Sequence, residues 1–179
     1  TTLGRVHRRL GLYDRAHRLL EQAVALNRAH RGARDPETLE SLGSLGDVLE
    51  DQGEHEEAAA IYRDQLAAYR ALYGESHPRV AVAMNSLALA LSADGAFDEA
   101  EELHRSALAI NRRELEADDP EVAVNLSQLA SLLMLQGDYE RSEPLYRESL
   151  ERRRKTYGDA HPSVAIGLNN LAVLYRDQG

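Results

Sequence analysis

Proline and glycine recur along this chain at a fixed spacing of 42 residues. Four of the five prolines share one phase, at Pro36, Pro78, Pro120 and Pro162. A second phase is glycine throughout, at Gly11, Gly53, Gly95, Gly137 and Gly179. A period of this length with fixed turn positions indicates tandem repeats, in which neighbouring units bury apolar surface against each other rather than around one centre.

The composition narrows the class of protein. There is no cysteine, which excludes a disulfide framework and a thiolate metal site and favours a cytoplasmic location. The longest apolar run, Val80 to Ala93, is interrupted by Asn85 and Ser86 and is shorter than the roughly 20 residues of a membrane span. The net charge of −9 argues against a nucleic-acid surface. We therefore expect neither a membrane nor nucleic acid as a partner.

Each repeat is predicted to form two antiparallel helices and no strand. Proline suits the first position of a helix, and Asp35 and Asp119 precede it as N-caps, whereas His77 and His161 are poorer caps. Glycine then ends the helices. The predicted helices are residues 2–10, 13–31, 36–52, 55–73, 78–94, 97–115, 120–136, 139–157 and 162–178.

The ends of the chain and one exception qualify this pattern. We expect one repeat domain over 1–179, with a partial unit 1–35, units 36–77, 78–119 and 120–161, and a terminal helix 162–179. The chain starts inside a first helix and stops at the glycine after another, so we expect a piece of a longer array. Glu116 replaces the glycine found at Gly32, Gly74 and Gly158, which predicts that the helix before it runs on or ends less sharply.

A weaker pattern has twice the period. The second and fourth units share Tyr62 and Tyr146, Tyr73 and Tyr157, and His77 and His161. The first and third share Asn27 and Asn111, Arg28 and Arg112, and Asp35 and Asp119. This alternation indicates a duplicated pair of repeats.

The recurring residues resemble a known family. The segments HPSVAIGLNNLAVLYRDQG and QGDYERSEPLYRESLERRRKTYGDAHP are similar to the 42-residue tetratricopeptide repeats of kinesin light chains and their bacterial relatives. The resemblance covers the whole chain and implies a right-handed α-solenoid that serves as a protein-binding scaffold. Such repeats bind many partners, so the resemblance does not name one.

The resemblance also implies a peptide-binding groove lined by the first helix of each pair. The spacing supports this reading, because 82, 85 and 89 share one helix face. The apolar members predict a contact strip, and the amides could bond a peptide backbone. Alternatively, the amides bond the neighbouring repeat and the apolar residues pack beneath the solenoid. The predicted groove residues are Arg5, Arg8, Asp47, Glu50, Val82, Asn85, Leu89, Val124, Gln128, Ser131, Ile166, Asn169, Asn170 and Val173.

Self-assembly is a second possibility. Residues 1–35 carry a net charge of +5 and residues 36–77 a net charge of −8, which reflects either drift of solvated faces or head-to-tail association. The terminal helix is apolar on several sides, with Val164, Leu168 and Leu174, and no polar capping helix follows it. The alternative prediction is therefore a structural module that associates end to end as a homo-oligomer.

Catalysis is not predicted. The sequence contains no HExxH motif, no glycine-rich phosphate loop and no nucleophile elbow. No two histidines stand four residues apart, and Glu101 and Glu102 are expected on a solvated outer face. We expect a non-catalytic protein without cofactor or metal, whose partner is a protein or a peptide.

Overall fold

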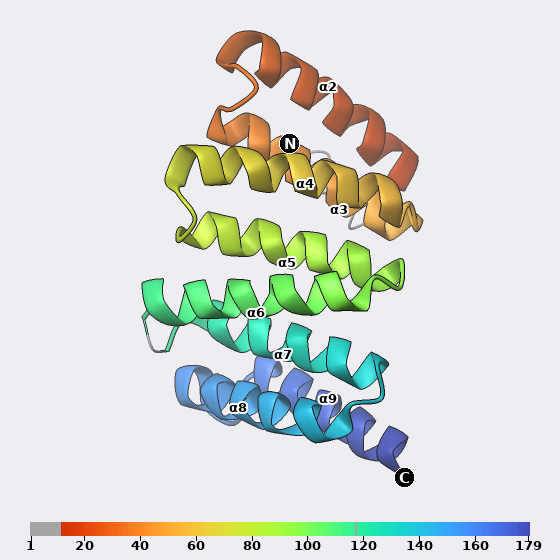
Figure 1. The fold of residues 1–179 in the computed structure, drawn as a ribbon, viewed down its shortest axis with the longest axis vertical. Coiled ribbons are helices and arrows are strands. Elements are labelled where there is room, and N and C mark those ends of the chain that lie inside the picture. The colour runs from red at the N-terminus through yellow and green to blue at the C-terminus, as the bar shows by residue number, and fades with distance from the viewer. Residues whose placement is uncertain (1–11, 117) are drawn as a thin grey trace. The chain divides into compact units, whose positions relative to one another are not determined.

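The computed structural model describes residues 12–116 and 118–179. These residues form eight helices and no strand (Figure 1). The all-α repeat array is thus confirmed, and each helix agrees with its predicted range to within one residue. The predicted helix 2–10 lies outside the described residues. The helices are α2 Tyr13–Arg31, α3 Pro36–Gln52, α4 His55–Tyr73, α5 Pro78–Ala93, α6 Phe97–Glu114, α7 Pro120–Leu135, α8 Tyr139–Tyr157 and α9 Pro162–Gln178.

The helices fall into two compact units, Thr1–Gly95 and Ala96–Gly179. In the first unit α3 packs against α2 and α4, and α4 packs against α5. In the second unit α7 packs against α6 and α8, and α8 packs against α9. A shift by two repeats carries α2, α3, α4 and α5 onto α6, α7, α8 and α9. The two units are therefore two versions of one arrangement of four helices.

Two kinds of junction alternate with this doubled period. Asn27 Nδ2 donates to Ser41 Oγ at 3.0 Å, and its counterpart Asn111 Nδ2 donates to Asn125 Oδ1 at 2.6 Å. At the other junctions a tyrosine stacks on the histidine four residues later. The centroids of the rings are 4.4 Å apart both in Tyr73 with His77 and in Tyr157 with His161. The alternation predicted from the sequence is a real alternation of contacts.

The N-caps follow the same alternation. Asp35 accepts a hydrogen bond from the backbone N–H of Glu37 at 2.9 Å, as Asp119 does from Glu121. His77 Nδ1 accepts one from Arg79 at 3.1 Å, and His161 does the same from Ser163. The two histidines make the same capping bond as the two aspartates, at a slightly longer distance. A neutral imidazole nitrogen is an acceptor like the carboxylate oxygen, and the stacked tyrosine holds the ring in place.

The expectation for the helix before Glu116 was wrong. We expected that helix to run on or to end less sharply, but α6 ends at Glu114, and Leu115 is extended with φ −102°. Gly32 and Gly74 end α2 and α4 with φ of 98° and 81°. A side chain disfavours such positive φ, so the chain leaves α6 earlier through an ordinary extended residue.

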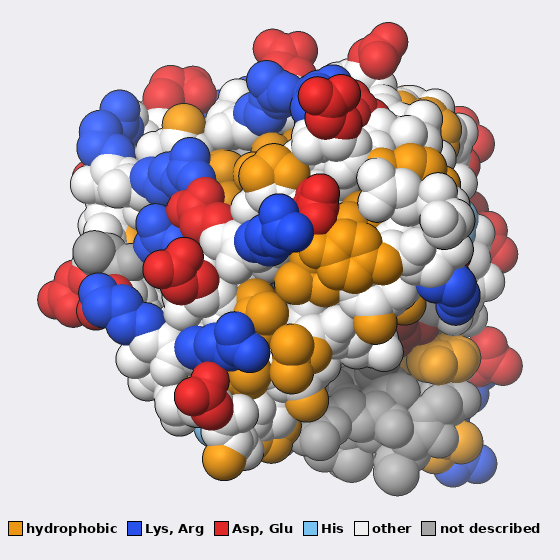
Figure 2. Space-filling view, turned by 90° about the horizontal axis from the view of Figure 1, so that it is seen from below, with side chains coloured by type: hydrophobic (Ala, Val, Ile, Leu, Met, Phe, Trp, Pro, Cys, Tyr) orange, Lys and Arg blue, Asp and Glu red, His pale blue; other side chains and the backbone are white. Residues whose placement is uncertain are grey.

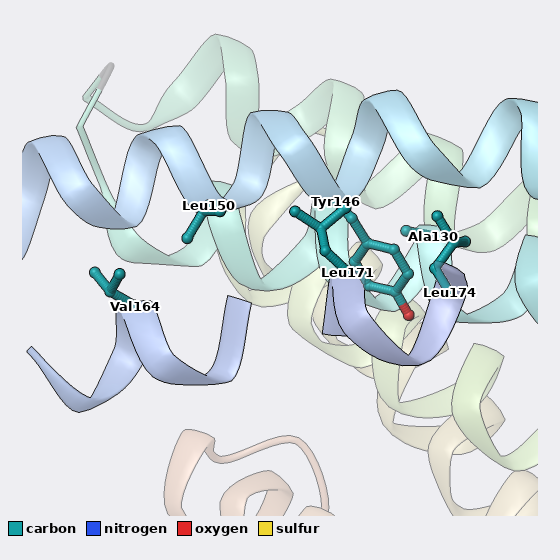
Figure 3. Packing of buried hydrophobic residues seen from close by; sticks show 6 residues of the cluster. All are labelled: Ala130, Tyr146, Leu150, Val164, Leu171 and Leu174. Atoms are coloured by element: carbon teal, nitrogen blue, oxygen red, sulfur yellow. The ribbon is translucent and has the colours of Figure 1, made fainter. Parts of the chain in front are cut away.

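The core of each unit lies between successive helices. In the first unit Ala16 and Leu20 of α2 pack against Leu45 and Val48 of α3. In the second unit α7, α8 and α9 share a cluster in which the Tyr146 ring lies beside Leu171 and Leu174 (Figure 3). Small residues at one place of the second helices are fully buried, at Ala16, Ala58, Ala100 and Ser142. The remaining members of the cluster in Figure 3 are Ala130, Leu150 and Val164.

Candidate functional site

A hollow of about 420 Å³ opens in the first unit between α3 and α5. Its α3 side comes from positions spaced by three or four residues, which form one face of that helix. Two predicted groove residues, Asp47 and Val82, line it together. We call this site the inner hollow, and its lining is Glu40, Gly43, Ser44 and Asp47 of α3, Gln65 and Tyr69 of α4, and Arg79, Val82 and Ser86 of α5.

One side of the inner hollow carries a fixed cation. Arg79 Nη1 donates to Glu40 Oε1 at 2.9 Å, and its guanidinium carbon lies 5.9 Å from the ring centroids of both Tyr69 and Tyr73. The bond to Glu40 raises the pKa of Arg79, and burial raises the pKa of Tyr69. The arginine therefore stays charged and the tyrosine stays neutral, which leaves a cation, a carboxylate and an aromatic face at one rim.

A glycine on α3 makes room for the floor of the inner hollow. A Cβ on Gly43 would stand 2.5 Å from Nε2 of Gln65. That nitrogen donates to the backbone oxygen of Leu39 at 2.7 Å. The missing side chain therefore lets an amide from α4 reach across and satisfy a carbonyl of α3. Gln65 is buried, so it shapes the floor more than it offers free hydrogen-bonding groups.

The remaining predicted residues of the first unit differ in exposure. Val82 and Leu89 of α5 are 48% and 44% exposed, unusual values for aliphatic side chains on a packed helix. Asn85 lies between them in sequence but is only 5% exposed, so its amide does not face solvent. Glu50 is half-buried, and its Oε1 lies 3.1 Å from His55 Nδ1. Arg5 and Arg8 lie outside the described residues.

In the second unit the predicted residues on α7 are all half-buried. They are Val124, Gln128 and Ser131. The hydroxyl groups of Ser131 and Tyr146 are hydrogen-bonded at 2.7 Å. Oε1 of Gln128 is buried and has no hydrogen-bond partner among the residues that the structure describes. A buried acceptor without a donor is uncommon and costs free energy unless something supplies one.

The predicted residues on α9 are more exposed. Ile166 and Asn169 are exposed, and Asn170 and Val173 are half-buried. Another side of α9 is also open, because Leu168 is 47% exposed while Leu126, at the same place of the repeat on α7, is fully buried. In the space-filling view of Figure 2, hydrophobic side chains lie among many charged ones.

The contributors to the inner hollow that sequence reasoning missed include Gln65, Tyr69 and Arg79. The first two lie on α4, a second helix, whereas the prediction drew only on first helices. Arg79 stands in the first turn of α5, before the face that the spacing singled out. A signal was present for Gln65, because Gly43 stands where the other first helices carry Asn85, Ser127 and Asn169.

Two further properties bear on the kind of site. Within residues 12–116 and 118–179, no three histidine, aspartate or glutamate side chains are placed to hold a metal ion. In the same part of the chain, no helix combines the length and the apolar character that crossing a membrane requires.

The eight helices of the described residues define a class, the helical tandem-repeat proteins. The sequence model of the tetratricopeptide repeat matches residues 1–71, 37–113 and 121–179. The chain belongs to the tetratricopeptide repeat family. Proteins of this family are in general non-catalytic scaffolds that mediate contacts between proteins.

Solved structures agree with this assignment. The crystal structure of a Podosopora anserina candidate kinesin light chain with nearly identical repeats has a TM-score of 0.82 at 26% identity, covering 99% of this chain and 84% of that chain. BtubC from P. vanneervenii gives 0.78 at 25% identity, covering 93% of this chain and 66% of that chain. No curated protein matches the sequence.

A more distant structure shares the fold alone. The Rap protein, solved in complex with competence and sporulation factor, has a TM-score of 0.78 at 15% identity. The match covers 97% of this chain and 49% of that chain, so this chain spans about half the length of the Rap protein.

Proposed function

We propose that this chain is a non-catalytic interaction module that binds an extended segment of a protein along the inner faces of its first helices. The observation that carries the proposal is the inner hollow, where α3 and α5 bring predicted groove residues together around a space of about 420 Å³. That volume is within the usual range of ligand pockets, roughly 300–1,000 Å³. Because the helices are already folded, the conformational entropy lost on binding is mainly that of the partner.

The lining suggests how a segment would be held. Val82, which is largely exposed, offers apolar contact to a side chain of the segment. Asp47, which also accepts a hydrogen bond from Tyr62, offers a carboxylate beside it, and the pair of Arg79 with Glu40 offers both charges at the rim. A mixed polar and apolar segment fits such a lining better than a uniformly charged one.

Gln128 supports the same reading in the second unit. Its Oε1 is buried and has no donor among the described residues, so a turn of this half-buried side chain would present the amide to the backbone of an extended peptide. Val124, four residues earlier on α7, would give apolar contact beside it.

The proposal is tested by placing charges on the inner face. The double variant Leu89→Arg with Val124→Arg should retain its helical circular dichroism and lose the proteins that the unaltered chain captures from its native lysate, as identified by mass spectrometry. Capture fails because two guanidinium groups replace apolar contacts. If the double variant captures the same proteins, the assignment of the groove is wrong.

A matched control uses the outer helices. Leu26 of α2 and Leu72 of α4 are exposed at 60% and 43%, compared with 44% for Leu89, whereas Val124 is half-buried. Leu26→Arg with Leu72→Arg adds the same charge without touching the proposed groove. Capture should survive in this control, and its loss in both double variants would point to a general effect of charge.

A second candidate function is self-association through α9. Its support is the open side of that helix, where Leu168 and Tyr175 are largely exposed although Leu126 and Leu133, their counterparts on α7, are buried. In the repeat such positions are covered by a second helix, as α8 covers α7. A further copy of the chain could provide that cover.

Light scattering over a concentration series distinguishes the two candidates. Self-association through α9 predicts a mass that rises with concentration in the unaltered chain and stays monomeric in Leu168→Glu. A strict monomer that still captures a partner would exclude assembly and favour the groove.

A further inference from the structure

The second unit has another open site on its outer side. A channel of about 560 Å³ lies between the second helices α6 and α8. None of the residues predicted for the groove takes part in it. We call it the outer channel, and its lining is Arg105, Leu108, Ala109 and Arg112 of α6, Leu129 and Leu133 of α7, and Glu140, Arg141, Pro144 and Leu145 of α8.

The floor of the outer channel is apolar and fixed. Leu108, Leu129 and Leu133 are buried members of one core cluster, and Leu145 packs against them. The walls are low, because Ala109 faces the channel from α6 and Pro144 faces it from α8. Both of these residues are exposed. An apolar side chain entering between them would reach leucines that the core already holds in place.

Three of the four charged residues that line the outer channel are arginines, and the fourth is Glu140. Arg105 and Arg112 stand two turns apart on α6, and Arg141 stands on α8. Arg105 Nη2 lies 2.8 Å from Glu101, which also contacts Arg141. A guanidinium group has five N–H donors, so these pairs orient the arginines and leave donors for a further carboxylate.

Arg112 is held in the same way from the opposite helix. Its Nη2 donates to Glu148 Oε2 of α8 at 2.8 Å, and Glu148 is also bonded by Arg152 at 3.0 Å. The three rim arginines remain 44–56% exposed in spite of these contacts. Their charge is therefore accessible to a partner that approaches along the channel.

The first unit carries the opposite charges at the equivalent rim. A shift by two repeats carries Arg105, Arg112, Glu140 and Arg141 onto Glu21, Arg28, Glu56 and Glu57. Three arginines and one glutamate thus correspond to one arginine and three glutamates. The floor changes much less, since Leu129, Leu133 and Ala109 correspond to Leu45, Leu49 and Ala25. The two positions share most of their apolar residues and differ in the sign of the charge at the rim.

We propose that the outer channel of the second unit is a docking site for an amphipathic helix that carries acidic residues beside its apolar face. The helix would lie between α6 and α8 with its apolar side chains over Leu108, Leu133 and Leu145. Its carboxylates would reach Arg105, Arg112 and Arg141. The charge at the rim selects for acids, and the two parallel ridges of the channel suit the shape of a helix.

A helix fits the channel better than a small molecule. The lining residues of α6 are spaced by three, four and seven residues, and apolar anchors of a docked helix follow the same spacing. The rim arginines are spread over two turns, a length that one helix spans and that a compact ligand does not. The open sides of the channel leave room for the polar face of such a helix in water.

Binding can be measured with two synthetic helices. Each is a fluorescein-labelled amphipathic peptide of about 18 residues, or five turns, with leucines at helical spacing on one face. One peptide has glutamates beside the leucines and the other has lysines. Fluorescence anisotropy should show saturable binding of the glutamate peptide at low salt and at least tenfold weaker binding of the lysine peptide. Salt should reduce the difference, because it screens the exposed charges.

A pair of equivalent alanines provides the variant and its control. Ala109→Glu blocks the channel and opposes an acidic partner, and it should weaken binding of the glutamate peptide at least tenfold. Ala25→Glu introduces the same side chain at the equivalent exposed place of the first unit and should leave binding unchanged. Arg105→Gln with Arg112→Gln should narrow the difference between the two peptides while the leucine contacts remain.

Three outcomes would overturn the proposal. The first is the absence of saturable binding by the glutamate peptide, and the second is equal binding of the two peptides at low salt. The third is an equal loss of binding in Ala109→Glu and Ala25→Glu. All of these readouts are independent of the inner hollow, so its failure and that of the outer channel are distinguishable.

Discussion

The two units satisfy the same carbonyl groups with different side chains. In the first unit Gly43 leaves room for Gln65, which donates to the oxygen of Leu39 at 2.7 Å. In the second unit the two positions are Ser127 and Ser149, and Ser149 donates to the oxygen of Ala123 at the same distance. A long side chain opposite a glycine is exchanged for two short ones, which shows that the repeat preserves a contact and not a residue.

A second pair of positions differs in charge state. Leu20 is buried in the core of the first unit, and its counterpart in the second is His104, which is also fully buried. Burial lowers the pKa of His104 to about 4. The shape of the core is kept, but the second unit has acquired a group that responds to pH.

The largest expected effect is on the shared core. Leu42→Ala in the first unit and Leu126→Ala in the second should each lower the free energy of unfolding by about 2–5 kcal/mol, because both leucines are buried and leave a cavity. Urea unfolding followed by circular dichroism measures this loss. Leu168→Ala, which removes an exposed side chain at the same place of the repeat, should cost less than about 1 kcal/mol. A comparable cost at all three sites would contradict the burial described here.

The second largest expected effect is a difference between the two units in how acid changes their stability. Below a pH of about 6.5 the imidazole of an unfolded chain binds a proton, whereas His104 in the folded chain stays neutral until about pH 4. The unfolded state then binds more protons, so the contribution of His104 to stability falls as the pH falls through this window, by up to about 3 kcal/mol. His104→Leu, which copies Leu20, should remove that part of the loss in urea titrations at about pH 7 and about pH 5. An unchanged loss in the variant would show that His104 is not the group responsible.

The third expected effect is on the free energy of unfolding when Gly43 and Gln65 are replaced by the serines found at the same places in the second unit. Gly43→Ser and Gln65→Ser should each cost about 1–3 kcal/mol, the first by crowding the amide and the second by losing its bond. The double variant reproduces the pair found in the second unit and should be more stable than the sum of the single costs by about 1 kcal/mol or more. Strict additivity in urea unfolding would mean that the two positions are independent.

The smallest expected difference concerns two tyrosines. The hydroxyl of Tyr62 donates to Asp47 at 3.0 Å, whereas that of Tyr146 is paired with Ser131 at 2.7 Å. A bond to a carboxylate contributes more than one between two hydroxyl groups, so Tyr62→Phe should cost about 1.5–2 kcal/mol and Tyr146→Phe about 1 kcal/mol. The reverse order in thermal or urea unfolding would show that exposure of Asp47 outweighs its charge.

Much of the fold could be predicted because the repeat places its strongest signals at the ends of helices. Proline fixes where α3, α5, α7 and α9 begin, and a glycine lies one or two residues after the end of every described helix except α6. Where a residue of ordinary conformation replaced the glycine, at Glu116, the expected end was wrong. Helical spacing also placed Val82 and Leu89 together on the exposed side of α5.

The site was less predictable for a physical reason. Spacing along one helix cannot show what a neighbouring helix contributes, so Gln65 and Tyr69 of α4 were missed at the inner hollow. It also cannot tell a groove-facing amide from one that turns inward, as Asn85 does. The outer channel depends on residues of three helices, so spacing along any one of them does not predict it.

The alternating junctions have a consequence for changing the length of this molecule. If two consecutive repeats were removed or inserted, each tyrosine would still stack on a histidine and each asparagine would still face its hydrogen-bond acceptor. Both kinds of junction would then remain complete. A change by a single repeat would keep the order of first and second helices but would pair residues from different kinds of junction. Asn27, for instance, would face Ala83 instead of Ser41. The natural increment for lengthening or shortening the array is therefore four helices, even though the smallest visible period contains two.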